Sequence, residues 1–256
     1  MADTFDYVIV GSGAAGSVLA NRLTEDPEVT VCVLECGPPD RHPYIHIPAG
    51  FIKMLFNPTY TWQFHTEPGE GINGRSIPTT QGRTLGGSSS INGMIYNRGQ
   101  REDFDQWAQR GNRGWGYVDI LPYFKRGERR LGVGDERIHG RGGNLPVTDN
   151  DWNHPAMEAF IEGAQELGIP RCVDYNSGDN QMGVGYFQRL IHKGYRHSAA
   201  RVFLHPAKAT GRLDVRTDAR AAQVLFDGTR AQPGRRLCHR PARRPRLRRR
   251  VASRCI

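Results

Sequence analysis

The chain has 256 residues, with 35 Lys and Arg against 26 Asp and Glu and a formal net charge of +9. This length allows one large domain or two modest ones with a buried core. The apolar fraction, about 46% with Gly counted and Tyr left out, lies in the range of globular proteins and excludes global disorder. No continuous apolar run of about 18 residues exists, so no membrane span is predicted.

Signals for secretion, disulfides or metal binding are not found. The N-terminus carries Asp3 and Asp6 where a secretory signal has a basic region and an apolar stretch. The five cysteines show no C-x-x-C spacing and the nine histidines no H-E-x-x-H motif, so we predict neither a disulfide framework nor a metal site. Scattered cysteines are typical of a reducing compartment, and we predict a cytoplasmic protein.

The positive charge is concentrated at the C-terminal end. Residues 232–256 contain ten Arg, three Pro and no Asp or Glu. Without these ten, 25 basic side chains remain against 26 acidic ones, a net charge of −1. The basic charge therefore does not indicate what the rest of the chain binds. Such a stretch cannot bury enough apolar surface to offset its chain entropy, and it is predicted to be disordered.

The first 35 residues predict a strand, a helix and a second strand. Residues 5–10 (FDYVIV) are typical of a buried strand, residues 17–24 have apolar positions at helical spacing, and residues 29–34 (VTVCVL) predict the second strand. Gly11-Ser12-Gly13-Ala14-Ala15-Gly16 lies between the first strand and the helix, and Glu35 follows the second strand. This order is the dinucleotide-binding fingerprint, G-x-G-x-x-G with a later acidic residue.

Each residue type in this fingerprint has a physical reason. Gly11 permits the tight turn, Gly13 lets the backbone approach a pyrophosphate, and Gly16 lets the helix pack on the sheet. The pyrophosphate lies at the helix N-terminus, where free N–H groups and the helix dipole favour an anion. Glu35 is expected to accept hydrogen bonds from ribose hydroxyls and to repel a 2′-phosphate. The fingerprint thus predicts dinucleotide binding and disfavours NADP, but it does not separate FAD from NAD.

A second glycine-rich segment lies in the middle of the chain. Residues 82–105 read GRTLGGSSSINGMIYNRGQREDFD, and their small residues allow the backbone to lie against a ligand. The segment resembles the first signature of the glucose–methanol–choline (GMC) oxidoreductases, flavoenzymes that oxidise alcohols. The positions that match this signature are Gly82, Arg83, Leu85, Gly86, Gly87, Ser88, Ser89, Ile91, Asn92, Tyr96, Gly99 and Asp105.

Other segments resemble the same family in the same order, so that the resemblance covers residues 5–231. Before the signature these are residues 47–50 (IPAG), Trp62 and residues 66–68 (TEP). After it come Trp107, Gly111, residues 114–115 (GW) and 121–124 (LPYF), then residues 183–188 (GVGYFQ), Arg196 with Ser198, and residues 204–207 (LHPA).

The resemblance implies FAD as the cofactor and indicates which residues hold it. Residues 92–95 would lie beside the isoalloxazine, and Ala221, where the family more often has Val, would lie at the adenine end. The full set of implied contacts is Gly11, Ser12, Gly13, Ala14, Ala15, Gly16, Glu35, Thr84, Leu85, Asn92, Gly93, Met94, Ile95 and Ala221. Asn97 stands where an aliphatic residue is usual, and nothing in the sequence explains it.

The resemblance also implies a reaction. In the family, a hydride passes from the carbon of an alcohol to flavin N5, while a His with a second His or Asn handles the hydroxyl proton. That pair lies in the C-terminal part of a chain about twice as long. We therefore assign no catalytic residue and expect residues 1–256 not to turn over alcohols. The implied substrate is a small alcohol, and the electron acceptor, oxygen, a quinone or another, stays open.

The resemblance ends inside a predicted hairpin. Residues 224–226 (VLF) followed by Asp227-Gly228 predict a strand that enters a tight turn. The family continues with a second apolar strand, whereas this chain continues with the arginine-rich residues 232–256. One explanation is a basic arm for nucleic acid or an anionic surface, and the other is a shifted reading frame. The abrupt change inside a hairpin favours the second, and we expect no nucleic-acid partner.

The predicted fold class is α/β, a Rossmann-type FAD-binding domain with part of an α+β substrate domain. We predict the FAD-binding domain at 1–150 and 200–231, part of the substrate domain at 151–199 and the disordered tail at 232–256. Pro155 to Leu167 predict a helix with apolar residues on one face. The predicted function is FAD-dependent oxidation of choline or another primary alcohol. The alternatives are another Rossmann dehydrogenase that uses NAD or FAD and a nucleic-acid-binding protein.

Overall fold

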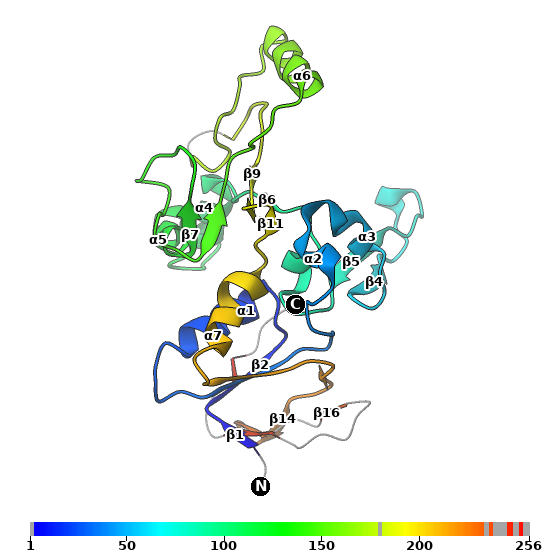
Figure 1. Ribbon diagram of the computed structural model, residues 1–256, viewed down its shortest axis with the longest axis vertical. Coiled ribbons are helices and arrows are strands. Elements are labelled where there is room, and N and C mark those ends of the chain that lie inside the picture. The colour runs from blue at the N-terminus through cyan, green and yellow to red at the C-terminus, as the bar shows by residue number, and fades with distance from the viewer. Residues whose placement is uncertain (1–2, 179–180, 233–235, 238–244, 248–250, 253–256) are drawn as a thin grey trace. The chain divides into compact units, whose positions relative to one another are not determined.

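The computed structural model describes residues 3–178, 181–232, 236–237, 245–247 and 251–252. Its contacts divide the chain into two compact units, both visible in Figure 1. The first unit comprises Met1–Gly93 and Arg196–Ile256, and the second comprises Met94–Tyr195. The second unit is therefore inserted into the sequence of the first.

A parallel four-stranded sheet with the order β12-β3-β2-β18 forms the centre of the first unit. Its strands are β2 (Tyr7–Val10), β3 (Val31–Leu34), β12 (Leu213–Arg216) and β18 (Val251–Ala252). In β3, Val31, Cys32 and Val33 are fully buried, as expected for an apolar strand inside a parallel sheet. The two strands predicted at residues 5–10 and 29–34 are found as β2 and β3 with shorter bounds, because a bend at Asp6 separates Phe5 from β2 and because residues 29–30 precede β3.

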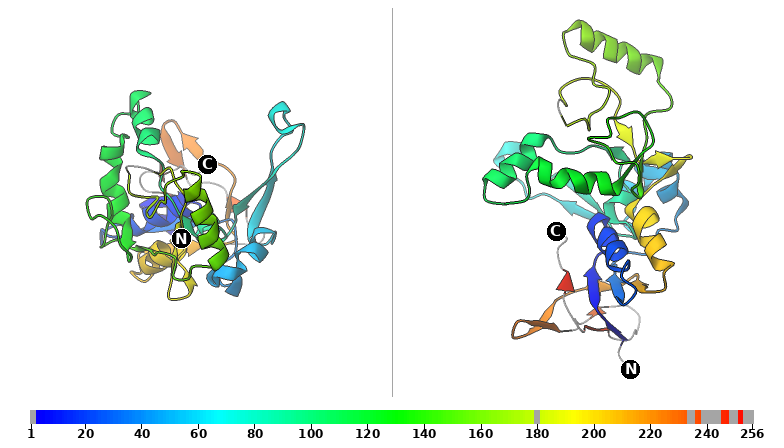
Figure 2. Two further views of the ribbon diagram at one scale, coloured as in Figure 1. Left: turned by 90° about the horizontal axis from the view of Figure 1, so that it is seen from above. Right: turned by 90° about the vertical axis from the view of Figure 1, so that its left-hand side faces the viewer.

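Helices pack against this sheet. α1 (Ala14–Leu23) connects β2 to β3 and contacts the π-helical turn η4 (Ala200–Leu204), which continues into α7 (His205–Lys208). In Figure 2, α1 (blue) and α7 (gold) lie side by side. The buried core that joins helices and sheet consists of Ile9, Ala20, Val31, Val33, Leu85, Ala200, Leu204, Ala207 and Leu213. The predicted strand–helix–strand order is confirmed.

The other elements of the first unit are short. Between β3 and the second glycine-rich segment lie α2 (Pro43–His46), η1 (Pro48–Gly50), α3 (Phe51–Leu55), β4 (Thr61–His65), η2 (Glu70–Ile72) and β5 (Pro78–Gly82). β4 and β5 pair as an antiparallel arm, seen in cyan in Figure 2. The remaining elements are β1 (Asp3–Phe5), η3 (Gly87–Ser90), β13 (Arg220–Ala221), β14 (Leu225–Asp227), β15 (Arg230–Gln232), β16 (Arg236–Leu237) and β17 (Pro245–Leu247). β14 and β15 form the hairpin predicted around Gly228.

The second unit combines helices with two- and three-residue strands. Its helices are α4 (Arg101–Gln109), α5 (Tyr117–Gly127) and α6 (Pro155–Glu166), and its strand pairs are β6 (Ile95–Tyr96) with β9 (Gln188–Arg189) and β7 (Glu128–Arg130) with β8 (Leu145–Val147). β10 (Ile191–His192) and β11 (Tyr195–Arg196) form a hairpin that leads back to the first unit. The helix predicted at 155–167 is confirmed as α6. Ile161 is buried in it, whereas Phe160 is 68% and Leu167 83% exposed.

The domain assignments stay predictions. The contact division places residues 94–150 in the second unit, whereas the sequence predicted them as part of the FAD-binding domain. Within the predicted tail 232–256, the structure describes Gln232 and the strands β16, β17 and β18, and the other tail residues lie outside the described residues. Within the described ranges, none of the helices has the length and apolar character needed to span a membrane.

Candidate cofactor-binding site

The first glycine-rich loop follows the carboxyl end of β2 and leads into α1. Gly11 has a φ of +86°, which confirms that the tight turn uses a conformation that favours glycine. A Cβ on Gly16 would lie 2.1 Å from the carbonyl oxygen of Gly11, so helix and loop can approach only with glycine there. Among the described residues, a Cβ on Gly13 would meet no protein atom within 4 Å, and the same holds for Gly11. Gly13, at the start of α1, is thus sterically open toward a ligand.

The N-terminus of α1 fits an anion. Among the described residues, no side chain caps this end at Gly13, and the first turn of α1 carries no acidic residue. The first hydrogen bond of the helix runs from the Ser17 N–H to the Gly13 carbonyl (2.9 Å). The N–H groups of Ala14, Ala15 and Gly16 consequently point out of the helix end. Together with the helix dipole they suit the diphosphate of a dinucleotide.

Glu35 connects this loop to the end of β3. Its side chain is almost fully buried. Oε2 accepts hydrogen bonds from the N–H (2.9 Å) and hydroxyl (2.7 Å) of Ser12, and Oε1 accepts one from the Gly37 N–H (2.8 Å). A carboxylate has about four lone-pair positions, so Oε1 can accept one further bond, as from a ribose hydroxyl. The role of Glu35 in holding the loop was not predicted from the sequence.

The second glycine-rich segment packs directly on the first. The Gly86 N–H donates to the Ser12 carbonyl (3.0 Å), and a Cβ on Gly87 would lie 2.7 Å from the Cα of Gly13. Thr84 is fully buried, and its hydroxyl donates to the Pro38 carbonyl (2.8 Å). Leu85 belongs to the core cluster. The fold therefore uses the side chains of these two predicted site residues, which leaves their backbone for a cofactor.

Arg196 holds the end of this segment. It is 1% exposed, and its Nε donates to the Ile45 carbonyl (2.7 Å). Its Nη1 donates to the Ser89 carbonyl (3.1 Å) and to Oδ1 of Asn92 (2.8 Å). The Ser89 hydroxyl also accepts the Ala199 N–H (2.9 Å). The predicted residue Asn92 is thereby fixed within the first unit, to which Gly93 also belongs.

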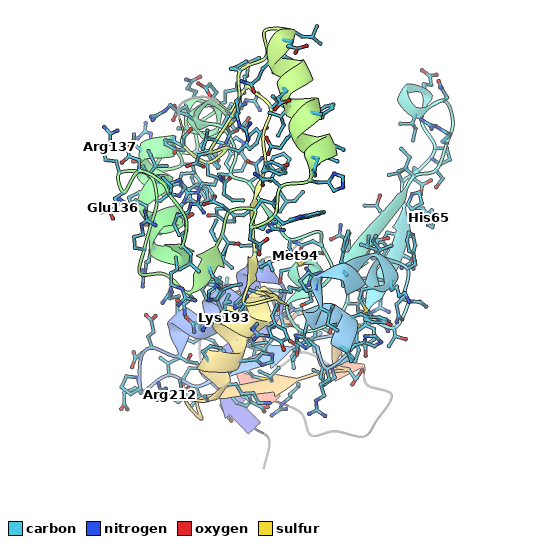
Figure 3. The ribbon with its side chains drawn as sticks, turned by 45° about the horizontal axis from the view of Figure 1, so that its top comes forward. His65, Met94, Glu136, Arg137, Lys193 and Arg212 are labelled. Atoms are coloured by element: carbon cyan, nitrogen blue, oxygen red, sulfur yellow. The ribbon has the colours of Figure 1, made fainter. Side chains whose placement is uncertain are left out.

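Met94 and Ile95 belong to the second unit. Met94, labelled in Figure 3, is buried with a φ of +60°, and its carbonyl accepts the Leu190 N–H (2.8 Å). A left-handed conformation is unusual for a residue with a long side chain and is often found at functional sites. Ile95 lies in β6 opposite Arg189 and is 55% exposed.

Ala221 lies in the first unit, on the segment that runs along the end of β3. The Ala219 N–H donates to the Glu35 carbonyl (2.8 Å), and the Asp218 N–H donates to the Gly37 carbonyl (3.0 Å). This segment leads into β13, which contains Ala221. Cys36 lies between Glu35 and Gly37, whose carbonyls accept these two hydrogen bonds. Burial raises the pKa of the Cys36 thiol, and the positive charge of Arg83 opposes this only in part. The structure thus brings the first loop, Glu35 and the segment of Ala221 together.

Gly37 has a packing role at this site that was not predicted from the sequence. A Cβ there would lie 2.0 Å from the carbonyl oxygen of Arg83, so only glycine lets the end of β3 approach the second loop. The sequence feature that could have indicated this role is its position two residues after Glu35, just beyond the end of a predicted strand.

A buried charged network in the second unit was also missed. His139 contacts Glu128 through Nδ1 (3.0 Å) and Asp174 through Nε2 (2.7 Å), and Arg98 donates to Glu128 (2.6 Å). Burial lowers the pKa of His139, but its hydrogen bonds to Asp174 and Glu128 outweigh this and raise the pKa to about 9. The four residues are far apart in the sequence, so no local pattern could have predicted this network.

Histidines at metal-ligand spacing are used for structure. His42 and His46 are four residues apart, the spacing of paired ligands on a helix. His42 Nδ1 accepts the Tyr44 N–H (3.2 Å), and His46 Nε2 is bonded to the Asp40 carbonyl (2.6 Å). Within the described residues, no group of three metal-ligating side chains is suited to a metal ion.

The parallel sheet and the paired glycine-rich loops define a Rossmann-type dinucleotide-binding protein. The chain belongs to the GMC oxidoreductase family, whose model matches residues 5–240. It is 43% identical over 236 residues to the mitochondrial choline dehydrogenase of Homo sapiens, a match that covers 90% of this chain and 39% of the relative.

Solved structures agree on the fold. Pyridoxine 4-oxidase from Mesorbium loti matches with a TM-score of 0.87 at 34% identity. The match covers 95% of this chain and 47% of the pyridoxine 4-oxidase chain. An FAD-dependent oxidoreductase from Chaetomium thermophilum has a TM-score of 0.86 at 28% identity, with 96% and 44% covered. The chain thus spans less than half the length of these proteins. The Chaetomium thermophilum protein is FAD-dependent. Membership of the GMC family indicates FAD as the cofactor of this chain, which decides between FAD and NAD where the fingerprint alone did not.

Proposed function

We propose that this chain binds FAD and serves the oxidation of the CH–OH group of a small alcohol. The observation that carries the proposal is the pairing of the two glycine-rich loops at the N-terminus of α1, with Gly13 open beside them. The choline dehydrogenase relative supports choline or another primary alcohol as the substrate. When bound, FAD supplies the chemistry by accepting a hydride from the alcohol carbon.

Each part of the cofactor has a proposed set of residues. The N–H groups of residues 14–16 bind the diphosphate, Oε1 of Glu35 accepts a ribose hydroxyl, Ala221 contacts the adenine end, and residues 92–95 lie beside the isoalloxazine. Residues 1–150 and 200–231 form the FAD-binding domain and residues 151–199 part of the substrate domain. We assign no catalytic residue and no electron acceptor. A cytoplasmic location is supported by the cysteine pattern alone.

A binding experiment tests the cofactor. Purified protein is mixed with FAD or with NAD, passed over a desalting column and examined by absorption and by flavin fluorescence after denaturation. We expect FAD to be retained and NAD to be lost. Retention of NAD without FAD would overturn the proposal.

A reduction experiment tests the activity. FAD-loaded protein is mixed without oxygen with choline, a small primary alcohol or an aryl alcohol, and the flavin absorption is followed. Because no proton acceptor is assigned in this chain, we expect reduction slower than about 1 s⁻¹. Faster reduction would mean that residues 1–256 contain the proton acceptor.

A further inference from the structure

Arg196 is a buried cation for which the described residues of the first unit provide no paired anion. Its guanidinium donates only to two backbone carbonyls and to the amide of Asn92. Among the described residues no carboxylate pairs with it, and its Nη2 is buried without a hydrogen-bond partner. Burial lowers its pKa to about 10, so Arg196 is still charged at neutral pH.

The other arginines that are buried within the described part of the chain are paired. In the second unit, Arg98 contacts Glu128 and Arg130 contacts Asp149. A buried charge without a partner is costly, and proteins usually pair it. Arg196 differs from Arg98 and Arg130 in having no carboxylate partner among the described residues, which indicates that something negatively charged or electron-rich completes this position.

Arg196 also determines which way the Asn92 amide is turned. A guanidinium has only donors, so the atom of Asn92 that faces it must be the carbonyl oxygen Oδ1. The amide nitrogen Nδ2 then lies on the other edge of the side chain, as a donor. Asn92 is half-buried and begins the four residues proposed to lie beside the isoalloxazine.

We propose that Arg196 is a positioning residue that fixes Asn92 with Nδ2 as a donor and whose unpaired positive charge makes this loop favour reduced over oxidised FAD. The proposal rests on the proposed function, because it needs FAD beside residues 92–95. Reduced FAD carries more negative charge at its ring, and a positive charge at low dielectric stabilises that form. Arg196 acts through Asn92 and through its charge, and it takes no part in proton transfer.

The unpaired charge is tested without cofactor by a double-mutant cycle in urea unfolding. Asn92→Asp places a carboxylate against the guanidinium, so we expect a higher urea midpoint in the background with Arg196. In the Arg196→Met background the same half-buried carboxylate has lost its cationic partner, and we expect a lower midpoint. An equal effect of Asn92→Asp in both backgrounds would overturn the claim that Arg196 is an unpaired cation.

The preference for reduced FAD is tested by the midpoint potential of the bound flavin. Arg196→Met and Asn92→Asp both remove the unpaired charge, and we expect about a tenfold weaker preference, which corresponds to a potential about 30 mV more negative for a two-electron couple. Arg196→Lys should retain most of the wild-type potential. Arg212 is a matched control in the same unit (Figure 3), because it also donates to a carbonyl, that of Thr24 (2.7 Å).

The outcomes separate the two proposals. Arg212→Met is expected to lower stability and to leave the potential unchanged. An unchanged potential in Asn92→Asp with FAD bound would overturn the inference even if Arg196→Met failed to fold. If wild-type protein bound no FAD, the proposed function and the redox claim would fail together, while the unfolding cycle would still decide whether the charge is unpaired.

Discussion

Gly13 and Gly16 of the first loop differ in how much space the protein leaves for a side chain, and this difference gives a paired prediction. Gly13 has no protein atom near its missing Cβ, whereas Gly16 faces the Gly11 carbonyl at 2.1 Å. We expect Gly13→Val to fold with nearly unchanged stability and to lose FAD. Gly16→Ala is expected to lose about 1–3 kcal/mol of unfolding free energy or more, because overpacking displaces backbone. Urea unfolding and FAD titration of both variants check this, and unchanged FAD affinity in Gly13→Val would contradict the diphosphate assignment.

Glu35 holds the first loop through hydrogen bonds, so its substitution is expected to affect stability as well as FAD binding. Its two oxygens accept three hydrogen bonds from Ser12 and Gly37. In Glu35→Gln an amide nitrogen must face one of these donors, so we expect a loss of about 1–3 kcal/mol in unfolding free energy even without cofactor. Denaturation of the apoprotein measures it, with Asp218→Asn as an exposed control. A stable Glu35→Gln apoprotein with weakened FAD binding would instead assign Glu35 to the ribose alone.

The sequence predicted the residues whose role depends on their near neighbours. Gly11, Gly13 and Gly16 follow from one local pattern, and the structure shows the positive φ at Gly11 and the close approach at Gly16, while the contact of Gly13 with a diphosphate stays a prediction. The roles of Arg196 and His139 could not be predicted, because their partners are distant in the sequence, from 11 residues for His139 and Glu128 to 151 for Arg196 and Ile45, or are backbone carbonyls that no pattern identifies.

At the scale of elements, the same division applies. β2, α1, β3 and α6 have strong apolar periodicity or caps within the element, and all four were predicted. The arm of β4 and β5 and the two-residue strands of the second unit were not. The two-residue strands are defined by a partner strand and are too short to carry an apolar pattern, and the alternation of Trp62 and Phe64 in β4 was not interpreted as a strand. The apolar periodicity of α6 predicted more buried side chains than the structure shows. Apolar spacing predicts that a helix has an apolar face, but it does not predict which residues cover that face.

α6 provides a prediction with an internal control. Ile161 is 3% exposed, whereas the adjacent Phe160 is 68% exposed. We expect Phe160→Lys to change the unfolding free energy by less than about 0.5 kcal/mol and to reduce self-association. Ile161→Ala should cost about 2–5 kcal/mol because it leaves a cavity. Urea unfolding and analytical ultracentrifugation check both, and an equal loss of stability in the two variants would show that Phe160 is covered in solution.

For the molecule as a whole, the net charge does not indicate where the buried charges lie. The first unit contains an unpaired buried cation, and the second contains paired buried charges around His139. The formal charge of +9 arises from neither, because ten of the arginines lie in residues 232–256. The response of the protein to pH is therefore expected to depend on the second unit more than on net charge.

The stability of the second unit should fall as the pH rises from about 6.5 to 9. Protonated His139 has a pKa raised from its ordinary 6.5 to about 9, so its contribution is complete below 6.5 and is lost as the pH passes through 9. Asp174 acts in the opposite direction, because its pKa is lowered by the hydrogen bond from His139 in spite of burial. Its contribution is present above its ordinary value and is lost in acid.

The size and origin of this alkaline loss can both be measured. For a buried group the shift corresponds to a loss on the order of 3 kcal/mol. Urea unfolding followed by tryptophan fluorescence reports it, since Trp107, Trp115 and Trp152 all lie in the second unit. His139→Gln should remove the slope between pH 6.5 and 9, while His65→Gln, an exposed histidine on the β4–β5 arm (Figure 3), should retain it. A slope that persists in His139→Gln would assign the alkaline loss to another group, and a flat wild-type profile would mean that His139 is not held protonated by its two carboxylates.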